Sequence, residues 1–289
     1  MARAEPTADR TSQAPANAAA ASTSTSTSAS ASAPTAEPSP FAGQVRRNFA
    51  RGAVRYGREA RLQRAVAWRL ARHCRDLAIP AGPCADLGAG TGLLAGSIER
   101  LRPELRLLRV DNCPPLLAQD APDTASLPWD LNGGLPPQLD GAALLGSSFA
   151  LQWLEQPERE LEHWSGQLRP GGWLALAVPT GASFAQWRAA AEAAAVPFTG
   201  LALPEAAHLE RAAARHLDIR LCRRLRFSRP APSALGFLGQ IKAIGAQASR
   251  GPRLRPVELR RLEAAWPKAT GNRLEWEVLL LLGRRPGAT

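Results

Sequence analysis

Short apolar runs alternate with helix-length amphipathic segments through the middle of the chain. The predicted strands cover 84–87, 105–110, 126–129, 141–149 and 173–178, and the predicted helices cover 93–101, 114–119 and 158–168. Parallel strands that are buried on both faces read as uninterrupted apolar runs. Strands that alternate with helices are typical of a doubly wound sheet. The pattern therefore predicts an α/β fold with a mostly parallel sheet.

Both flanks of this block follow a different pattern. Residues 41–78 place apolar residues at helical spacing among many arginines, which predicts a helical cover on the N-terminal side. Beyond Pro179 the predicted elements are less regular. They are helices at 183–195, 208–216 and 233–247 and strands at 217–227 and 274–282.

The start of the chain has a composition of its own. The first 40 residues contain no Val, Ile, Leu, Phe, Tyr or Trp and consist mainly of Ala, Ser, Thr and Pro. Such a segment cannot bury enough apolar surface to offset its ordering entropy, so we predict a disordered tail over 1–40 and one domain over 41–289. Organelle transit peptides are also rich in Ser and Ala, but this segment holds only two arginines against three acids.

Composition excludes several classes of protein. No apolar run approaches the roughly 20 residues of a membrane span, and no apolar segment follows a basic start as in a secretory signal. We therefore expect a cytoplasmic protein that does not contact a membrane. The four cysteines, at 74, 84, 113 and 222, form no C-x-x-C pair and have no histidine at ligand spacing, so we expect neither a metal site nor a disulfide framework.

The chain is basic, with 36 Lys and Arg against 25 Asp and Glu and a formal charge of +11. This balance favours an anionic partner, such as a nucleic acid, a phosphate-bearing substrate or an acidic protein. A compositional bias toward arginine explains it equally well, so charge alone does not choose a partner.

The strongest local signal is D-L-G-A-G-T-G at residues 86–92, which follows a predicted strand and precedes a predicted helix. Glycines permit a tight turn and a close approach of the backbone to a ligand, and a helix start offers N–H groups to an anion. The third glycine of the dinucleotide fingerprint would fall at Leu93. The pattern instead resembles motif I of class I S-adenosylmethionine methyltransferases. This resemblance implies that the methionine end of S-adenosylmethionine binds at Asp86, Gly88, Ala89, Gly90 and Gly92.

Further acids follow the next two predicted strands. Asp111 ends the second strand, where a carboxylate can accept hydrogen bonds from both ribose hydroxyls of a nucleotide. In methyltransferases of this kind a third acid lies near the adenine, and Asp123 and Asp130 are both candidates. Asp123 lies 12 residues after Asp111, which barely accommodates a helix and a returning strand, whereas Asp130 lies 19 residues after it. We therefore predict that Asp130 contacts the adenine, with Trp129 and Leu131 as apolar walls.

Several further motifs lie outside the glycine loop. They are F-A-R-G-A at 49–53, Tyr56, A-R-L-Q-R at 60–64, S-S-F-A-L-Q-W at 147–153, R-P-G-G at 169–172, K-A-I-G-A at 242–246 and W-E-V at 276–278. Together they resemble the malonyl-acyl-carrier-protein O-methyltransferases of biotin synthesis. Gly57 stands where that family often has Asp, and Ser148 where it often has Asn. The segment between Asp111 and Asp140 is compressed.

The resemblance implies a class I Rossmann-like fold. We expect a seven-stranded, mostly parallel sheet, an N-terminal helical cover over 41–80 and a lid inserted after strand five, at about 180–260. It also implies methyl transfer from S-adenosylmethionine to the free carboxylate of a malonyl thioester, which primes pimeloyl synthesis for biotin. The thioester is carried by an acyl carrier protein or by coenzyme A.

The same resemblance suggests residues for the substrate pocket. A malonyl carboxylate has a pKa near 4 and is ionised at pH 7, so the reaction requires no general base. Tyr56 and Gln152 are the candidates for positioning the substrate, Gln63 is a candidate for the cofactor side, and Trp153 for the pocket wall. An acidic carrier protein would meet a basic rim, for which the arginines between 220 and 229 are candidates; a solvated strand face is the alternative.

Three other functions remain open at this point. A small-molecule carboxylate methyltransferase of the trans-aconitate type shares the glycine loop and a similar A-L-Q-W, but the K-x-I-G-A segment argues against it. A nucleic-acid methyltransferase is disfavoured, because neither an N-P-P-Y or D-P-P-Y motif nor a suitably placed Pro-Cys occurs. A non-catalytic module that binds S-adenosylmethionine is disfavoured by the intact glycine loop.

Overall fold

The computed structural model describes residues 39–266, 271 and 273–287. Its strands form one seven-stranded sheet in the order β3-β2-β1-β4-β5-β7-β6. All neighbouring strands pair in parallel except where β7 runs antiparallel between β5 and β6. The strands are β1 (Cys84–Leu87), β2 (Leu108–Asp111), β3 (Ser126–Pro128), β4 (Ala142–Ser148), β5 (Leu168–Pro179), β6 (Asp218–Pro230) and β7 (Arg273–Arg284). The fold class expected from the sequence is confirmed.

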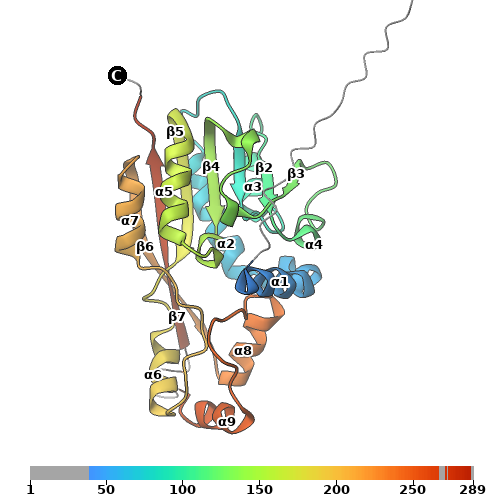
Figure 1. Cartoon of the computed structure of the whole chain (residues 1–289), viewed down its shortest axis with the longest axis vertical. Helices are drawn as coiled ribbons and strands as arrows, with labels where there is room; N and C mark the ends of the chain where they lie inside the picture. Colours follow the sequence, from blue (N-terminus) through green and yellow to red (C-terminus); the bar gives the residue numbers. More distant parts are fainter. Residues whose placement is uncertain (1–38, 267–270, 272, 288–289) are drawn as a thin grey trace, which may run out of the picture. The chain divides into compact units, whose positions relative to one another are not determined.

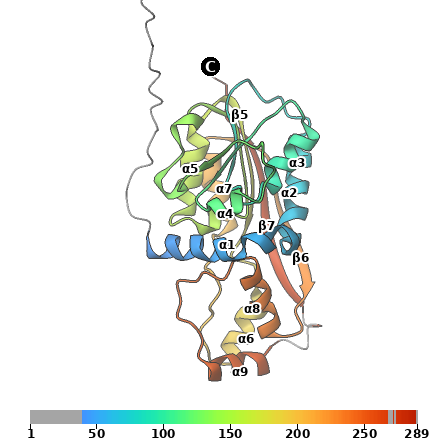
Figure 2. The same ribbon diagram turned by 90° about the vertical axis from the view of Figure 1, so that its right-hand side faces the viewer.

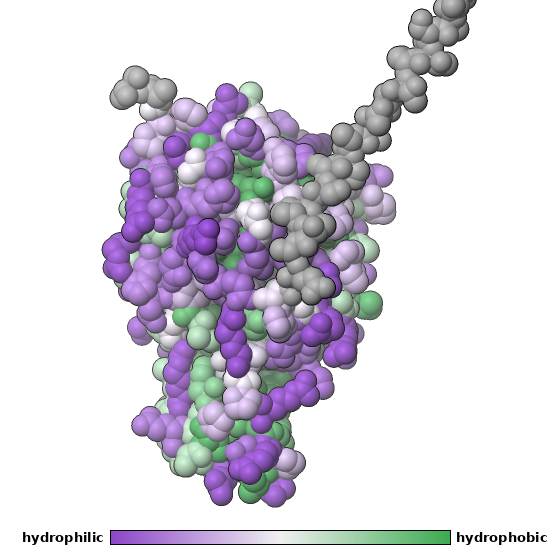
Figure 3. Space-filling model, viewed as in Figure 1, coloured by the Kyte–Doolittle hydropathy of each residue, from purple (hydrophilic) through white to green (hydrophobic). Residues whose placement is uncertain are grey.

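Helices cover both faces of the sheet (Figure 1). Helices α2 and α3 pack on one face, and α5 and α7 pack on the other. Their bounds are α2 (Arg61–Cys74), α3 (Leu93–Leu101), α5 (Pro157–Gln167) and α7 (Ala206–Ala214). Polar residues dominate the surface over α5 and α7 (Figure 3).

The sandwiched sheet explains the apolar runs of the sequence. Successive residues of a strand point to opposite faces of the sheet. Leu280 and Leu282 of β7 join the core beneath α2 and α3, whereas Leu279 and Leu281 join the core beneath α5 and α7. Because both faces are buried, every position has to be apolar, and the alternation expected of a half-exposed strand is absent here.

The N-terminal cover consists of two helices, where the sequence predicted one over 41–78. Helix α1 (Pro40–Glu59) ends at Ala60, whose φ of −77° and ψ of 52° leave the helical region, and α2 begins at Arg61. Ala60 is fully buried at this bend. The break turns α1 across the carboxyl ends of the strands, while α2 packs on the sheet (Figure 2). Ala60 is neither proline nor glycine, so the spacing of apolar residues in the sequence gave no sign of a break in the helix at this position.

The start of α1 also differs slightly from the expected boundary. The side chain of Ser39 caps the helix by accepting a hydrogen bond from the Ala42 amide at 3.1 Å. Pro40 is therefore the first helical residue, inside the tail expected over 1–40. The rest of that tail, residues 1–38, lies outside the described residues.

Three of the described helices after β5 lie outside the layers that cover the sheet, and they come from two places in the chain. Helix α6 (Ala185–Ala193) follows β5, and α8 (Ala234–Ala243) and α9 (Pro256–Ala264) follow β6. The range of about 180–260 expected for a lid therefore also contains α7 and β6, which belong to the sheet layers. The added helices gather around an aromatic cluster, in which the Phe184 and Trp276 rings lie 5.2 Å apart and the Trp187 and Phe237 rings 5.4 Å. None of the described helices combines the length and the apolar character that crossing a membrane requires.

Candidate functional site

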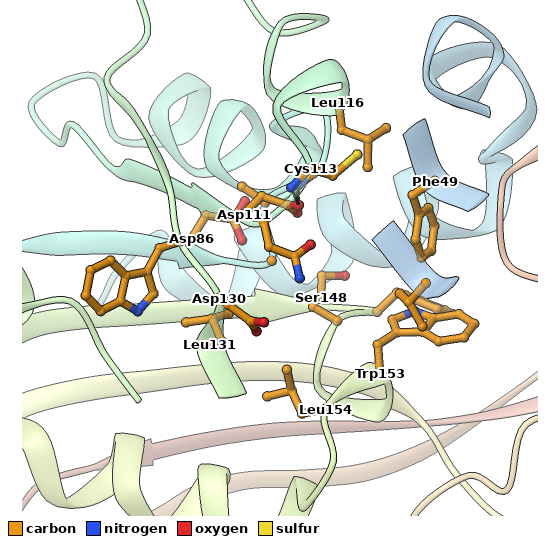
Figure 4. Close-up of a pocket in the computed structure, with 18 of the residues that line it drawn as sticks. Phe49, Asp86, Asp111, Cys113, Leu116, Asp130, Leu131, Ser148, Trp153 and Leu154 are labelled. Atoms are coloured by element: carbon orange, nitrogen blue, oxygen red, sulfur yellow. Dashed lines mark hydrogen bonds between the residues drawn. The ribbon is translucent and has the colours of Figure 1, made fainter. Parts of the chain in front are cut away.

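A cleft opens at the carboxyl ends of β1, β2 and β4, beneath α1 (Figure 4). The chain runs outward from β1 to β2 and β3 on one side, and from β4 to β5 on the other, so the cleft lies where the strand order reverses. Doubly wound folds bind their ligands at such a switch point. The cleft is open to solvent, and the space inside it, including its open mouth, is about 870 Å³. Short elements complete its rim: α4 (Pro114–Leu117), η1 (Leu131–Gly133) and η3 (Leu151–Trp153).

The glycine loop forms the floor of the cleft. Gly88 has φ of 69°, and a Cβ atom there would collide with the side chain of Ala150, so only glycine fits. The amides of Gly88 and Ala89 donate to the Val110 carbonyl at 2.7 and 3.0 Å. The Gly90 amide donates to the Asp111 carboxylate at 2.8 Å. These amides therefore fix the loop against β2, and contact between this loop and a cofactor stays a prediction.

Asp111 lies at the end of β2 and lines the cleft. Its Oδ2 accepts from the Gly90 amide at 2.8 Å, and its Oδ1 accepts from the Cys113 amide at 2.9 Å. The two bonds orient the carboxylate, and each oxygen keeps a lone pair for another donor. Burial raises the pKa of Asp111 to about 6, and the two amides oppose that shift. The group is ionised at neutral pH and can accept hydrogen bonds from a diol.

Asp86 is more deeply buried, with 1% of its surface exposed. One oxygen accepts from the Ala95 amide in the first turn of α3 at 3.0 Å, which ties β1 to the helix that follows the loop. Burial, together with a smaller contribution from the nearby acids Asp111 and Asp120, raises the pKa of Asp86 to about 7. The buried cation Arg109 opposes this shift. Asp86 therefore serves the loop's structure as well as lining the cleft.

The structure separates the two candidates for the adenine side. Asp130, Trp129 and Leu131 all line the cleft, whereas Asp123 is exposed and outside it. Asp130 caps η1 by accepting from the Asn132 amide at 3.0 Å, and the Trp129 indole donates to the Gly134 carbonyl at 2.9 Å. That Asp130 contacts the adenine stays a prediction, with which the position of Asp130 in the cleft is compatible.

The opposite wall consists of side chains from α1, α2 and η3. Phe49 packs edge-on against Trp153, with ring centroids 5.4 Å apart, and against Tyr56 at 6.2 Å. Gln63 of α2 lines the same cleft. Burial raises the pKa of Tyr56 well above its ordinary value, and the charges of Asp111 and Asp86 add to the effect, so its phenol keeps its proton.

Gln152 is not among the residues that line the cleft. It is buried, and its amide group donates to the Phe149 carbonyl at 2.8 Å. Phe149 has a φ of 56°, an uncommon conformation for a non-glycine residue, at the turn after β4. Gln152 therefore holds this turn with its Nε2, while its Oε1 has no hydrogen-bond partner within the described residues.

Sequence reasoning gave no role to Ser148 in the cleft. Ser148 lies between the acids and the aromatic wall (Figure 4). Its hydroxyl is buried and has no hydrogen-bond partner within the described part of the chain. A buried hydroxyl without a partner is costly, so a molecule in the cleft, either water or a ligand, is expected to satisfy it. The motif at 147–153 contains this residue, and its place at the end of β4 was the available signal.

The arginines between 220 and 229 lie on the edge strand β6. Three of them have carboxylates nearby: Arg220 lies 3.5 Å from Asp218, Arg224 2.9 Å from Glu210, and Arg226 3.9 Å from Glu277. None of these arginines lines the cleft. The strand has a largely balanced surface, which matches the solvated-face alternative.

Comparisons with known proteins identify relatives of this chain. A scan against models of known protein families gave no match. The chain is similar to the biotin biosynthesis bifunctional protein BioCD of Bordetella avium, with 34% identity over 211 residues that cover 71% of this chain and 44% of that one. It is also similar to the malonyl-[acyl-carrier protein] O-methyltransferase of Methylococcus capsulatus, with 31% identity over 208 residues that cover 69% of this chain and 75% of that one.

Other similarities are limited to a short stretch of sequence or to the fold. A stretch of 116 residues is 35% identical to the trans-aconitate 2-methyltransferase of Sinorhizobium fredii and covers 37% of this chain and 44% of that one. The fold is similar to that of the YcgJ protein from Bacillus subtilis, with a TM-score of 0.51, 10% identity and coverage of 78% of this chain and 100% of that one. A structure from Bacillus halodurans, described as a methyltransferase candidate, has a TM-score of 0.52 and 11% identity, and covers 75% of this chain and 98% of that one. At such identities the structural likeness supports the fold alone.

Proposed function

This chain belongs to the malonyl-[acyl-carrier protein] O-methyltransferase family, and we propose that it methylates the free carboxylate of a malonyl thioester, using S-adenosylmethionine. The methyl ester would enter pimeloyl synthesis for biotin, in keeping with the biotin-synthesis relative. The sequence similarity to carboxyl methyltransferases is the observation that carries the proposal. The cleft supports it through its place in the fold and its chemistry.

The residues of the cleft fit the cofactor. Three carboxylates line it, at Asp86, Asp111 and Asp130, and among its described lining residues there is no arginine or lysine. A positively charged ligand is therefore favoured. We propose that Asp111 accepts hydrogen bonds from the ribose hydroxyls and that Asp86 attracts the amino group of the methionine end. Asp130 would lie beside the adenine, between Trp129 and Leu131.

The opposite wall would hold the substrate. When bound, S-adenosylmethionine supplies a methyl group on a positively charged sulfur, which an ionised carboxylate accepts without a general base. We propose that Tyr56, Trp153 and Phe49 shape an apolar wall that keeps water from the carboxylate, while Gln63 contacts the cofactor from α2. The free Ser148 hydroxyl is placed to donate to one of the two ligands. Gln152 positions this wall through the Phe149 turn.

The substrate's carrier is an acyl carrier protein or coenzyme A. The name of the Methylococcus relative includes the carrier protein, and we propose the same partner here. The shared stretch with a trans-aconitate methyltransferase makes a small tricarboxylate the second candidate. Its similarity covers little more than a third of the chain, so the malonyl thioester is favoured.

A methyl-transfer assay tests the proposal directly. Labelled S-adenosylmethionine is incubated with malonyl-carrier protein, with malonyl-CoA, trans-aconitate and tRNA in parallel. We expect label on the malonyl thioester, released by mild base as a methyl ester is. Label on aconitate or RNA alone would reassign the substrate. Cofactor binding in calorimetry without transfer to any of the four would indicate a non-catalytic module.

A further inference from the structure

Helix α1 has two chemically opposite faces. Its inner face contributes Val45, Phe49 and Tyr56 to the cleft. Its exposed face carries Arg47, Arg51, Arg55 and Arg58, at spacings of three and four residues that place side chains on one side of a helix. No acidic residue occurs in α1 before Glu59, at its last position. The outer face is therefore a continuous cationic stripe.

The stripe also exposes an apolar side chain. Val54 lies among these arginines and is 83% exposed, the highest exposure among the large apolar residues of the described chain. Single exposed valines are common. Here the valine lies midway along a stripe that spans about 16 Å at 1.5 Å per residue, from Arg47 to Arg58. An arginine stripe with a central apolar contact matches the polar rim and apolar centre of a protein interface.

The arginines of β6 provide an internal comparison. Several of them already have carboxylate neighbours, as described above. On α1, the ion pair found within the described residues is the exposed one between Arg58 and Glu59, at 3.1 Å. Within the described residues the charge of the α1 stripe is thus less compensated. The inner face of the same helix lines the cleft, whereas β6 lies at the far edge of the sheet.

We propose that the outer face of α1 is the docking surface for the carrier protein, which meets it with an acidic surface. This inference rests on the proposed function. Complementary charge would speed the encounter and orient the carrier. Val54 would supply the apolar contact at the centre. Because the same helix forms the cleft wall, a carrier docked there places its thioester arm beside the cleft mouth.

Two charge-reversed variants test the proposal. One carries Arg47→Glu, Arg51→Glu and Arg55→Glu on α1, and the matched control carries Arg220→Glu, Arg223→Glu and Arg229→Glu on β6. The substrates are malonyl-carrier protein and malonyl-pantetheine, which has the same thioester without the protein. For the α1 variant we expect kcat/KM toward malonyl-carrier protein to fall about 10- to 100-fold, mainly through KM, with a weaker dependence on salt. Its kcat/KM toward malonyl-pantetheine should stay within about twofold, and the control should resemble the unmodified protein with both substrates.

Binding of fluorescently labelled carrier protein gives a second measurement that does not depend on turnover. The α1 variant should bind it at least about tenfold more weakly than the β6 variant, with unchanged affinity for S-adenosylmethionine. Equal losses in both variants, no loss in either, or an equal loss with malonyl-pantetheine would overturn the docking surface. Failure of the unmodified protein to methylate either thioester would overturn the proposed function first, and the docking surface with it.

Discussion

The two walls of the cleft are built by different means. On the cofactor side, main-chain groups and carboxylates fix one another: the Gly90 amide is bound to Asp111, and the Ala95 amide to Asp86. On the substrate side, Phe49 and Trp153 meet by ring packing alone, and the nearby Ser148 hydroxyl has no partner within the described residues. Hydrogen-bonded main chain has few alternative conformations, whereas aromatic packing can adjust. A change on the first wall should therefore affect folding and the cofactor together, and one on the second should affect the substrate.

The largest effect is expected at Gly88. In Gly88→Ala the added Cβ would meet Ala150 and strain a backbone with φ of 69°. We expect a loss of stability of about 2–5 kcal/mol, a fall in Tm of about 5–15 °C and loss of measurable cofactor binding. Thermal unfolding and calorimetry measure these. The control is Gly96→Ala, where a Cβ meets no atom within 4 Å, and which should leave Tm unchanged or slightly higher.

A smaller effect, on folding and on the cofactor together, is expected at Asp111, whose carboxylate also holds the Gly90 and Cys113 amides. Asp111→Ala should weaken S-adenosylmethionine binding about 10- to 100-fold, because it removes a charged acceptor of hydrogen bonds. Unchanged affinity in calorimetry would contradict the ribose assignment and leave Asp111 only as a clamp on Gly90. Asp123→Ala, at an exposed position outside the cleft, is the matched control.

The pH dependence follows from the two buried carboxylates. Ligand binding requires the ionised form, and the pKa values of Asp111 and Asp86 are raised to about 6 and about 7. Affinity for S-adenosylmethionine should therefore be full above about pH 8 and fall as the pH drops through 7 and 6. In Asp111→Asn the part of this loss near pH 6 should disappear, and the remaining part should move below pH 7, because the charge of Asp111 contributes to the raised pKa of Asp86. An affinity that does not change between pH 8 and pH 5 would show that neither carboxylate meets the cofactor.

The opposite wall should respond in substrate kinetics. Trp153→Ala removes the edge-on contact with Phe49 and one side of the cleft. We expect KM for the malonyl thioester to rise about 5- to 10-fold, in line with the roughly 1 kcal/mol of an aromatic pair, and cofactor affinity to change little. Trp68→Ala is the control, since Trp68 is 39% exposed on α2 and outside the cleft. An equal loss of cofactor affinity would remove the distinction between the walls.

The sequence predicted the cofactor wall better than the substrate wall, for a physical reason. The loop at 86–92 needs glycine at a positive φ and an acid at a strand end, and such requirements act on single residue types at fixed spacing. The bend at Ala60 and the stripe on α1 depend on which surface the helix meets, which no local pattern encodes. Gln152 illustrates the limit: its motif is specific, but the sequence did not show that its amide group donates to the Phe149 carbonyl, and its role toward the substrate stays a prediction. Ser148 was visible as the end of a predicted strand inside the 147–153 motif, but the sequence did not show that it lines the cleft.

The smallest effect, and the finest test of the cofactor wall, is at Asp130. One of its oxygens already accepts from the Asn132 amide and side chain, at 3.0 and 2.9 Å, so only the other is free for an adenine amino group. Asp130→Ala should weaken S-adenosylmethionine binding about 3- to 10-fold, which corresponds to about 1 kcal/mol for one hydrogen bond. Part of that loss could come from the freed turn at Asn132, and Asp130→Asn separates the two causes, because its carbonyl oxygen can still cap the turn. Asp130→Asn could bind S-adenosylmethionine as tightly as the unmodified protein while Asp130→Ala binds it more weakly. That result would show that Asp130 acts through the turn and that Trp129 and Leu131 alone hold the adenine.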